Sequence, residues 1–399
     1  MGFKTDATWL MPVGALFVAT FAVNTGENIV AGLLPVIAAD LHVDIPTAGQ
    51  LITGYALGVA SAGPALALVT TGISRRLLLF IVMAAFILGT VGCALSTSYA
   101  MLLGARLLTA ACNGLFFGIA VVIATQLAPK GRETSAVSLI VAGTTIASIA
   151  GVPIGTAIGN AYGWHSAFWA LVLASVGAAA ILALLVPSDL KQERLSKGQI
   201  RAEIAAALRP MVMLSYMIIV FFSIGPFLLI AYMVPFLTEL VGVSMVYVPL
   251  ALFGMGITGF VGNLAGGRLG DWKLFPSMIG ILVGWVCLSA LLAVVATNTW
   301  LALIVLGVMW CVGFSFVAPI QAQVLKEASA APNLAATLIS TAFNIGLASA
   351  AAIGGSAIAA GWGYRSLPWL DVISECIALG AVLVLATAKT RRNRAAVTL

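Results

Sequence analysis

The chain has 399 residues, of which 62% are hydrophobic and only 8% are charged, and its formal net charge is +6. A soluble domain carries about 25% charged residues because its surface faces water, so this composition excludes a water-exposed globule of this length. Since a membrane-spanning helix needs about 20 apolar residues, the chain could hold on the order of a dozen spans. We therefore expect an all-α integral membrane protein.

Twelve apolar runs follow one another along the chain, separated by short breaks rich in glycine, proline, asparagine or charge. The predicted spans are 9–38, 47–71, 77–95, 101–127, 134–162, 166–186, 211–240, 246–269, 275–296, 299–325, 333–360 and 367–388. The first run is too long for a cleaved signal peptide and no cleavage site follows it, which indicates a retained span.

Only residues 188–210 are long, polar and charged enough to form a linker. The predicted organisation is an N-terminal six-helix half (1–187), a cytoplasmic linker (188–210) and a C-terminal six-helix half (211–399). If the N-terminus is cytoplasmic, all but Arg106 and Arg365 of the 19 lysine and arginine residues fall on the cytoplasmic side. This bias predicts a multi-pass protein of the inner (cytoplasmic) membrane with both termini cytoplasmic, and it explains the net charge without nucleic-acid binding.

The two halves resemble each other in sequence. Residues 151–169 and 351–369 align at a fixed offset of 200 residues, with identities that include Gly155/Gly355, Ile158/Ile358, Gly163/Gly363, Ser166/Ser366 and Trp169/Trp369. Small residues at such places allow two helices to pack closely, so part of the match follows from composition. Duplicated six-helix halves are nevertheless a common plan among transporters, with the substrate site between the halves.

With these features the chain resembles the major facilitator superfamily, specifically the twelve-span drug–proton antiporter family and its sugar-efflux and chloramphenicol-export relatives. The resemblance covers essentially the whole chain. Its most specific segment, AGTTIASIAGVPIGTAIGNAYGW, is similar to the antiporter motif, with Gly151, Pro153 and Gly155 as its core. LLGARLLTAACNGLFFGIA is similar to the fourth-span motif, with Arg106 as its arginine. The resemblance implies the major facilitator fold, with two pseudo-symmetric six-helix halves.

Two cytoplasmic loops carry further parts of the family pattern. The loop after the second span keeps Arg75 and Arg76 but lacks the usual aspartate, whereas GGRLGDW in the second half keeps Arg268 and Asp271. The resemblance makes these four residues, with Gly151, Pro153 and Gly155, the candidate gating and motif residues. Pro153 interrupts the hydrogen-bond ladder of its helix and predicts a bend, which serves either packing alone or gating.

Glu27 is the most informative residue, because it is an acid inside an otherwise apolar run. An acidic side chain at the bilayer centre costs about 2.5–3.5 kcal/mol on insertion scales. Asn24, Glu27 and Asn28 lie at i, i+3 and i+4 and so share one face of the helix. Apolar surroundings disfavour the charged carboxylate, which suits Glu27 to bind and release a proton; the alternative is a hydrogen-bonded packing role. The segment ENIVAGLLPVIAADLHV also resembles the family's first-span pattern, which implies an acid at Glu27.

Arg106 is the second deep charge, and the resemblance associates it with proton transfer. A structural role, in which it binds backbone carbonyls or pairs with an acid, is the alternative that the sequence leaves open. Asp371 and Glu375 stand at i, i+4 in the outer part of the last span. Because twelfth spans commonly lie at the periphery, we expect these two acids to form an interfacial charge cluster without a transport role.

Uncharged polar and aromatic residues within the spans are the candidates for contact with substrate. The predicted substrate-binding residues are Asn24, Asn28, Tyr55, Asn113, Phe117, Tyr232, Gln321 and Asn344.

These observations predict a secondary active transporter that exports small amphipathic compounds or drugs by proton antiport. Export of a sugar or nucleoside-type metabolite is the alternative. The chain has no Walker A sequence and no HExxH or CxxC motif, which argues against ATP-driven transport, a metal site and an enzyme. The expected partners are a small-molecule substrate, protons and the lipid bilayer, with no cofactor and no nucleic acid, and we expect a monomer.

Overall fold

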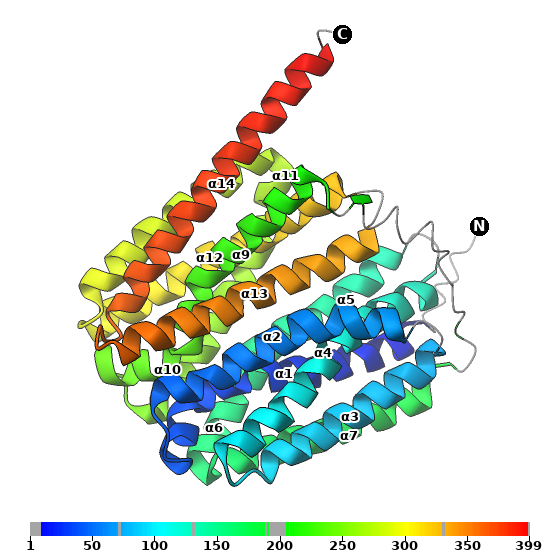
Figure 1. The fold of residues 1–399 in the computed structure, drawn as a ribbon, viewed down its shortest axis with the longest axis vertical. Coiled ribbons are helices and arrows are strands. Elements are labelled where there is room, and N and C mark those ends of the chain that lie inside the picture. Colours follow the sequence, from blue (N-terminus) through cyan, green and yellow to red (C-terminus); the bar gives the residue numbers. More distant parts are fainter. Residues whose placement is uncertain are drawn as a thin grey trace, which may run out of the picture. The chain divides into compact units, whose positions relative to one another are not determined.

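The computed structural model describes residues 9–70, 73–129, 132–187, 190, 205–206, 208–328 and 332–397. These residues are almost entirely helical and include no β-strand (Figure 1). The elements are α1 (Leu10–Asp40), α2 (Ile45–Val69), α3 (Arg75–Ala94), α4 (Tyr99–Leu127), α5 (Glu133–Ile146), η2 (Ala147–Gly151), α6 (Val152–Tyr162), α7 (Trp164–Leu185), α9 (Pro210–Ala231), α10 (Met233–Pro235), η3 (Phe236–Leu240), η4 (Met245–Tyr247), α11 (Val248–Val295), α12 (Thr299–Glu327), α13 (Pro332–Ala359) and α14 (Ser366–Val397). Helices suit a bilayer because they satisfy every backbone polar group within one segment. Most of the predicted linker lies outside the described residues.

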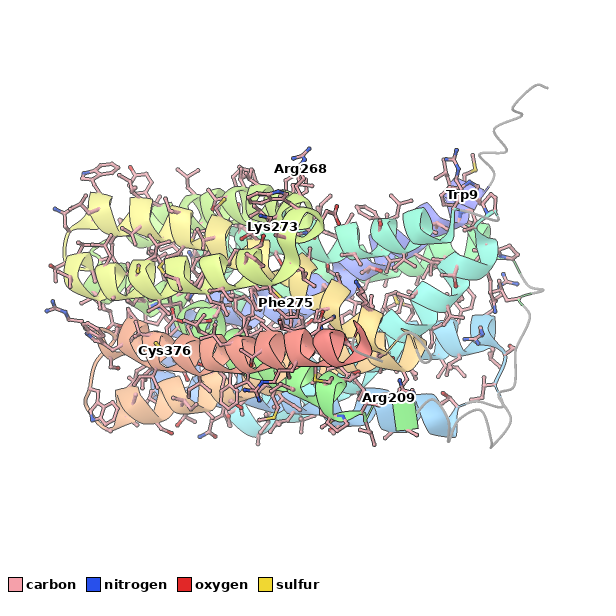
Figure 2. All side chains as sticks on the ribbon, turned by 90° about the horizontal axis from the view of Figure 1, so that it is seen from above. Trp9, Arg209, Arg268, Lys273, Phe275 and Cys376 are labelled. Carbon is pink, nitrogen blue, oxygen red and sulfur yellow. The ribbon has the colours of Figure 1, made fainter. Side chains whose placement is uncertain are left out.

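Ten helices of the described part are long and apolar enough to cross a membrane. One of the ten segments, Met245–Val295, covers two of the predicted spans, and α2 is not among the ten. A straight helix with the 48 residues of α11 would be about 70 Å long, more than twice the thickness of the hydrocarbon core. The backbone of Lys273 is non-helical (φ −151°, ψ 94°), and this residue lies where two helical segments of α11 meet (Figure 2). The total of twelve spans in two halves stays a prediction.

The chain forms two compact units. Unit 1 comprises Met1–Asp44 and Gly54–Arg194, and unit 2 comprises Ile45–Thr53 and Leu195–Leu399. Each unit buries its own apolar side chains, so each has a separate hydrophobic core. Large apolar side chains also remain exposed, such as Leu184 (83%), which is the pattern expected of a surface that faces lipid.

In unit 1, α1 is the central helix. It packs against α4, α5, η2, α6 and α7, while α3 packs against α4 and α7. Figure 1 shows α3 and α7 side by side. The position of α1 places its polar residues against several neighbouring helices instead of against lipid.

In unit 2, α11 packs along α12, and α9 packs against α13 and α14. The approach of α11 to α12 depends on two glycines spaced as in a GxxxG motif, since a Cβ on Gly262 would lie 1.9 Å from the backbone oxygen of Cys311, and a Cβ on Gly266 would lie 2.1 Å from that of Ser315. Only glycine leaves room for backbone at these distances.

Candidate functional site

The carboxylate of Glu27 lies in a hydrogen-bonded network inside unit 1. Asn113 on α4 donates from Nδ2 to Glu27 Oε2 at 3.0 Å and to Tyr55 Oη on α2 at 3.2 Å. Asn113 and Tyr55 are buried, and Glu27 is partly buried. Because an amide has two N–H groups, Asn113 can serve both acceptors at once. The structure thus joins three of the predicted site residues, which come from three different helices.

Arg106 completes this network through the backbone of α1. Its side chain is buried, and its guanidinium donates from Nη1 to the carbonyl oxygen of Gly26 and from Nη2 to that of Glu27, the latter at 2.9 Å. The guanidinium carbon lies 3.9 Å from the centre of the Tyr55 ring, a cation–π contact. Within the described residues no ion pair joins Arg106 to the Glu27 carboxylate. Of the alternatives that the sequence left open, binding to backbone carbonyls is therefore the observed one.

This arrangement can hold a proton without breaking a salt bridge. The Glu27 carboxylate has a neutral amide as its hydrogen-bonding neighbour, while the nearby guanidinium is engaged with carbonyl oxygens. A carboxylate bound only by a neutral donor is less strongly held in its charged form than one in a bidentate pair with arginine. Glu27 is chemically suited to change its protonation state.

Asn24 and Asn28 lie on the same helix but use their amides locally. Asn24 Nδ2 donates to the carbonyl oxygen of Thr20 at 3.0 Å, and Asn28 Nδ2 donates to that of Asn24 at 3.2 Å. Phe117 is partly buried and packs against the apolar core of unit 1. The described hydrogen bonds do not connect these three predicted substrate residues to the Glu27 carboxylate.

The remaining predicted substrate residues belong to unit 2. Tyr232 is buried and its hydroxyl donates to the carbonyl oxygen of Ala351 at 2.6 Å. Asn344 donates from Nδ2 to the carbonyl oxygen of Ser340 at 3.1 Å, while its buried Oδ1 has no partner in the described part of the chain. Gln321 is partly buried. No described hydrogen bond joins these three residues to one another.

The glycines of the antiporter motif face the helix that carries Glu27. A Cβ on Gly151 would lie 2.1 Å from Thr25 Oγ1, and a Cβ on Gly155 would lie 2.5 Å from Ile29 Cδ1. Thr25 and Ile29 flank Glu27 on α1. The motif therefore brings its own helix into close contact with α1.

Pro153 follows a change of helical form in the same span. Residues of η2, Ala147–Gly151, form a π-helical turn between α5 and α6. Proline has no N–H group and cannot donate to the preceding turn, which favours a widened turn on its N-terminal side. The α-helical hydrogen-bond pattern is thus interrupted just before Pro153, and the predicted bend stays a prediction.

The arginines and aspartate of the loop patterns lie near helix ends or on exposed positions. Arg75 begins α3, and Arg76 donates from Nη2 to the carbonyl oxygen of Ala183 at 3.3 Å. Arg268 and Asp271 are exposed on α11, and Figure 2 shows Arg268 pointing outward. The described ion pairs include neither of these two residues.

The expectation that Asp371 and Glu375 form an interfacial charge cluster is wrong. Both side chains are fully buried in unit 2, and neither lies at an exposed interface. Their place near the outer end of the last predicted span had indicated an interfacial position. Their i, i+4 spacing was the better signal, because two acids on one face of an apolar helix are costly toward lipid.

Long apolar helices that enclose a carboxylate, an arginine and an asparagine define the class of the protein as a polytopic membrane transporter. Residues 16–332 match the Major Facilitator Superfamily, and the chain belongs to this family. The resemblance drawn from the motifs is thereby confirmed. The chain is a transport protein and not an enzyme.

Relatives of known sequence cover nearly the whole chain. The chain is 34% identical over 368 residues to the inner membrane transport protein YdhP of Escherichia coli (strain K12), which covers 92% of this chain and 94% of that protein. It is 32% identical over 345 residues to the uncharacterized MFS-type transporter YtbD of Bacillus subtilis (strain 168), and the alignment covers 86% of this chain and 87% of that protein. It is 28% identical over 376 residues to the chloramphenicol resistance protein of Streptomyces lividans, and the alignment covers 92% of this chain and 94% of that protein.

A solved structure has the same fold. A bacterial homolog of the human lysosomal transporter Spinster, in an inward-facing and unoccupied conformation, superimposes with a TM-score of 0.75 at 14% identity, covering 97% of this chain and 98% of that one. This similarity supports the major facilitator fold, and with the relatives it makes the chain a multi-pass membrane protein.

Proposed function

We propose that the protein exports small amphipathic compounds from the cytoplasm in exchange for protons. Glu27 binds and releases the coupling proton, and Arg106 holds α1 in place through two of its carbonyl groups. The single observation that carries the proposal is the Glu27 carboxylate, which lies within α1 with Asn113 as its hydrogen-bond donor and no described ion-pair partner.

The character of the substrate is argued from the hydrogen bonds of unit 1. Asn113 uses its amide on two acceptors within the protein, and Asn24 and Asn28 each use one N–H group on a backbone carbonyl, so fewer donors remain for the hydroxyl groups of a sugar. This favours an amphipathic compound over the sugar or nucleoside alternative. The name of the Streptomyces lividans relative adds weak support for drug export.

The remaining parts of the proposal concern architecture and gating. Twelve spans form two pseudo-symmetric halves, 1–187 and 211–399, which alternate access around a central substrate site. Both termini face the cytoplasm, and the protein acts as a monomer. The motif residues Gly151, Pro153 and Gly155 take part in gating by changing how α6 packs against α1.

The coupling role is tested with Glu27→Gln in proteoliposomes that carry a pH-sensitive dye inside. Glutamine keeps the shape and the acceptor for Asn113 but cannot exchange a proton, so substrate-driven proton movement is expected to fall to background while folding is retained. Glu239→Gln, an exposed acid in unit 2, is the matched control and should couple normally. Normal coupling in Glu27→Gln would overturn the assignment.

The substrate class is tested in an efflux-deficient host with and without a proton-gradient uncoupler. Chloramphenicol and a lipophilic cationic dye represent amphipathic compounds, and a labelled pentose represents sugars. Uncoupler-sensitive export of the first two but not of the pentose is expected. The reverse pattern would select the sugar alternative.

A further inference from the structure

Two acids of α14 form a buried pair inside unit 2. Asp371 and Glu375 are one helical turn apart, and both side chains are fully buried. They face the same point on α9, since a Cβ on Gly225 would lie 2.0 Å from Asp371 Oδ1 and 2.6 Å from Glu375 Oε1. Gly225 therefore leaves room for two carboxyl groups between α9 and α14.

The two carboxyl groups have very different surroundings. Trp285 on α11 donates from Nε1 to Asp371 Oδ1 at 2.9 Å and to Oδ2 at 3.0 Å, and the Ser289 hydroxyl donates to Oδ2 at 2.8 Å. By contrast, neither Oε1 nor Oε2 of Glu375 has a hydrogen-bond partner among the described residues, although both oxygens are buried. The donors thus stabilise a charged Asp371, and none is available to a charged Glu375.

No positive charge compensates the pair within the described residues. Arg365 is the nearest basic residue in sequence, but it is exposed and donates to the carbonyl oxygen of Ala293. Three helices pack against α14, namely α9, α11 and α13. The titratable side chains described on these helices and next to the pair are Tyr216 on α9, Arg268, Asp271, Lys273 and Cys287 on α11, and Cys376 on α14. None of them has a described hydrogen bond or ion pair with either acid.

Two neighbouring carboxylates cannot both be charged in a medium of low dielectric constant without a counter-ion. We propose that Asp371 and Glu375 form a second protonation site of the transporter, which holds one proton on Glu375 beside a hydrogen-bonded, charged Asp371. A role of this site in coupling rests on the proposed function of proton-driven transport. The binding of a proton at this site does not depend on that function.

A similar three-residue contact lies beside Glu27 in unit 1, at offsets of 199 to 200 residues from Gly225, Trp285 and Asp371. In unit 1, a Cβ on Gly26 would lie 2.9 Å from Phe86 Cζ and 3.0 Å from Leu171 Cδ2. About 200 residues later the same three positions are filled by Gly225, Trp285 and Asp371. An apolar contact in unit 1 is therefore replaced by a hydrogen-bonded acid in unit 2.

Arg106 has no basic counterpart at these offsets, because the residues 199 and 200 positions later are Val305 and Leu306. Unit 1 thus buries a guanidinium next to its acid, and unit 2 buries two acids with no arginine at the equivalent place. Because unit 2 has no arginine at this place, a proton can take over the neutralisation of one of the two acids.

A proton fits the site better than a sodium ion. A metal cation needs several oxygen ligands, and no group of three or more histidine, cysteine or acidic side chains suited to a metal occurs in the described part. The indole N–H of Trp285 also points at both oxygens of Asp371, which satisfies a carboxylate and disfavours a cation at that place. The proton requires only the unpartnered oxygens of Glu375.

The proposal is tested first by infrared difference spectroscopy of the purified full-length protein between acidic and alkaline pH. A carboxyl C=O band that shifts in D₂O should be present in Glu27→Gln, where the Glu27 carboxyl cannot contribute, and absent in the double variant Glu27→Gln/Glu375→Gln. Ser289→Ala, which removes one donor from Asp371, should move the pH midpoint of this band. A band that survives in the double variant, or one that never titrates while the protein stays folded, overturns the proposal. A sodium titration that abolishes the band would assign the site to a cation instead and likewise overturn it.

A transport measurement then separates this site from Glu27. If both sites carry protons, Glu375→Gln should retain substrate-driven proton movement at about half the wild-type number of protons per substrate, because one of two sites is lost. Glu27→Gln should still abolish it, because the proposed function makes substrate-driven proton release depend on Glu27. An unchanged ratio in Glu375→Gln overturns the coupling role of the pair while leaving the proposed role of Glu27 intact, and size-exclusion profiles report folding of each variant.

Discussion

Arg106 shows how a buried guanidinium can bind backbone carbonyls in place of an acidic partner. Its guanidinium serves two carbonyl oxygens of α1 and lies over the Tyr55 ring. A carbonyl oxygen has two lone pairs and can accept a second hydrogen bond beside that of the helix. The planar fork of arginine directs its N–H groups at both oxygens and lies over the ring, whereas lysine has a compact ammonium group on a flexible stem and no planar face.

Arg106→Lys is therefore expected to lower the free energy of unfolding by about 2–3 kcal/mol, because a hydrogen bond to a charged group contributes about 1.5–3 kcal/mol. Unfolding in mixed micelles, followed by tryptophan fluorescence, measures the change. Arg268→Lys is the matched control, since Arg268 is exposed and its replacement should change stability by less than about 0.5 kcal/mol. Equal effects of the two variants would contradict the role of Arg106.

Helix contacts in this protein depend on where glycine is placed. On α11, Gly266 faces the backbone of Ser315 on α12, whereas a Cβ on the adjacent Gly267 would meet no neighbouring atom within 4 Å. Adjacent residues of a helix point about 100° apart, so one of the two faces the neighbouring helix and the other does not. Substitution of Gly266 and of Gly267 in turn therefore compares the effect of helix packing on stability with that of intrinsic helix propensity.

Gly266→Ala is expected to destabilise the protein by about 1–3 kcal/mol, because a methyl group there must push two backbones apart. Gly267→Ala should be neutral or stabilising by up to about 1 kcal/mol, since alanine favours a helix over glycine. Thermal unfolding of both variants in detergent checks the prediction. Equal destabilisation by the two substitutions would show that the contact of α11 with α12 tolerates a side chain.

At the scale of the whole molecule, orientation follows from charge. The loops that are predicted to be cytoplasmic hold nearly all lysine and arginine residues, and such residues resist translocation across the membrane. Only Gly163 separates α6 from α7, and His165 follows in the first turn of α7; no lysine or arginine lies at this turn, as expected of an outer loop. The two sides of the membrane are thus predicted from composition alone.

Impermeant thiol labelling checks this orientation in a variant that lacks the five native cysteines. Tyr162→Cys, at the exposed end of α6, should react in intact cells. Ser196→Cys, in the predicted linker, should react only after the cells are permeabilised. The opposite pattern would invert the predicted topology.

The apolar runs predicted most helices because backbone groups in a bilayer must be bonded within their own segment. The span of α1 and the acid within it were predictable for the same reason. The sequence also predicted an interruption of the fifth span from Pro153, whose missing N–H group acts locally. Family membership could be predicted as well, because the motif glycines and Arg106 are read from consecutive residues.

Only the tertiary structure decided which side chains meet. Asn113 binds the carboxylate of Glu27 although the two residues are 86 positions apart in the sequence, and Trp285 binds the carboxylate of Asp371 at the same separation. Helical periodicity predicts which residues of one helix share a face, but not which neighbour that face contacts. Asp371 and Glu375 were therefore misjudged as interfacial. A chain with 8% charged residues has few acids within its spans, and whether each faces lipid, a cation or a proton site depends on the packing of the surrounding helices.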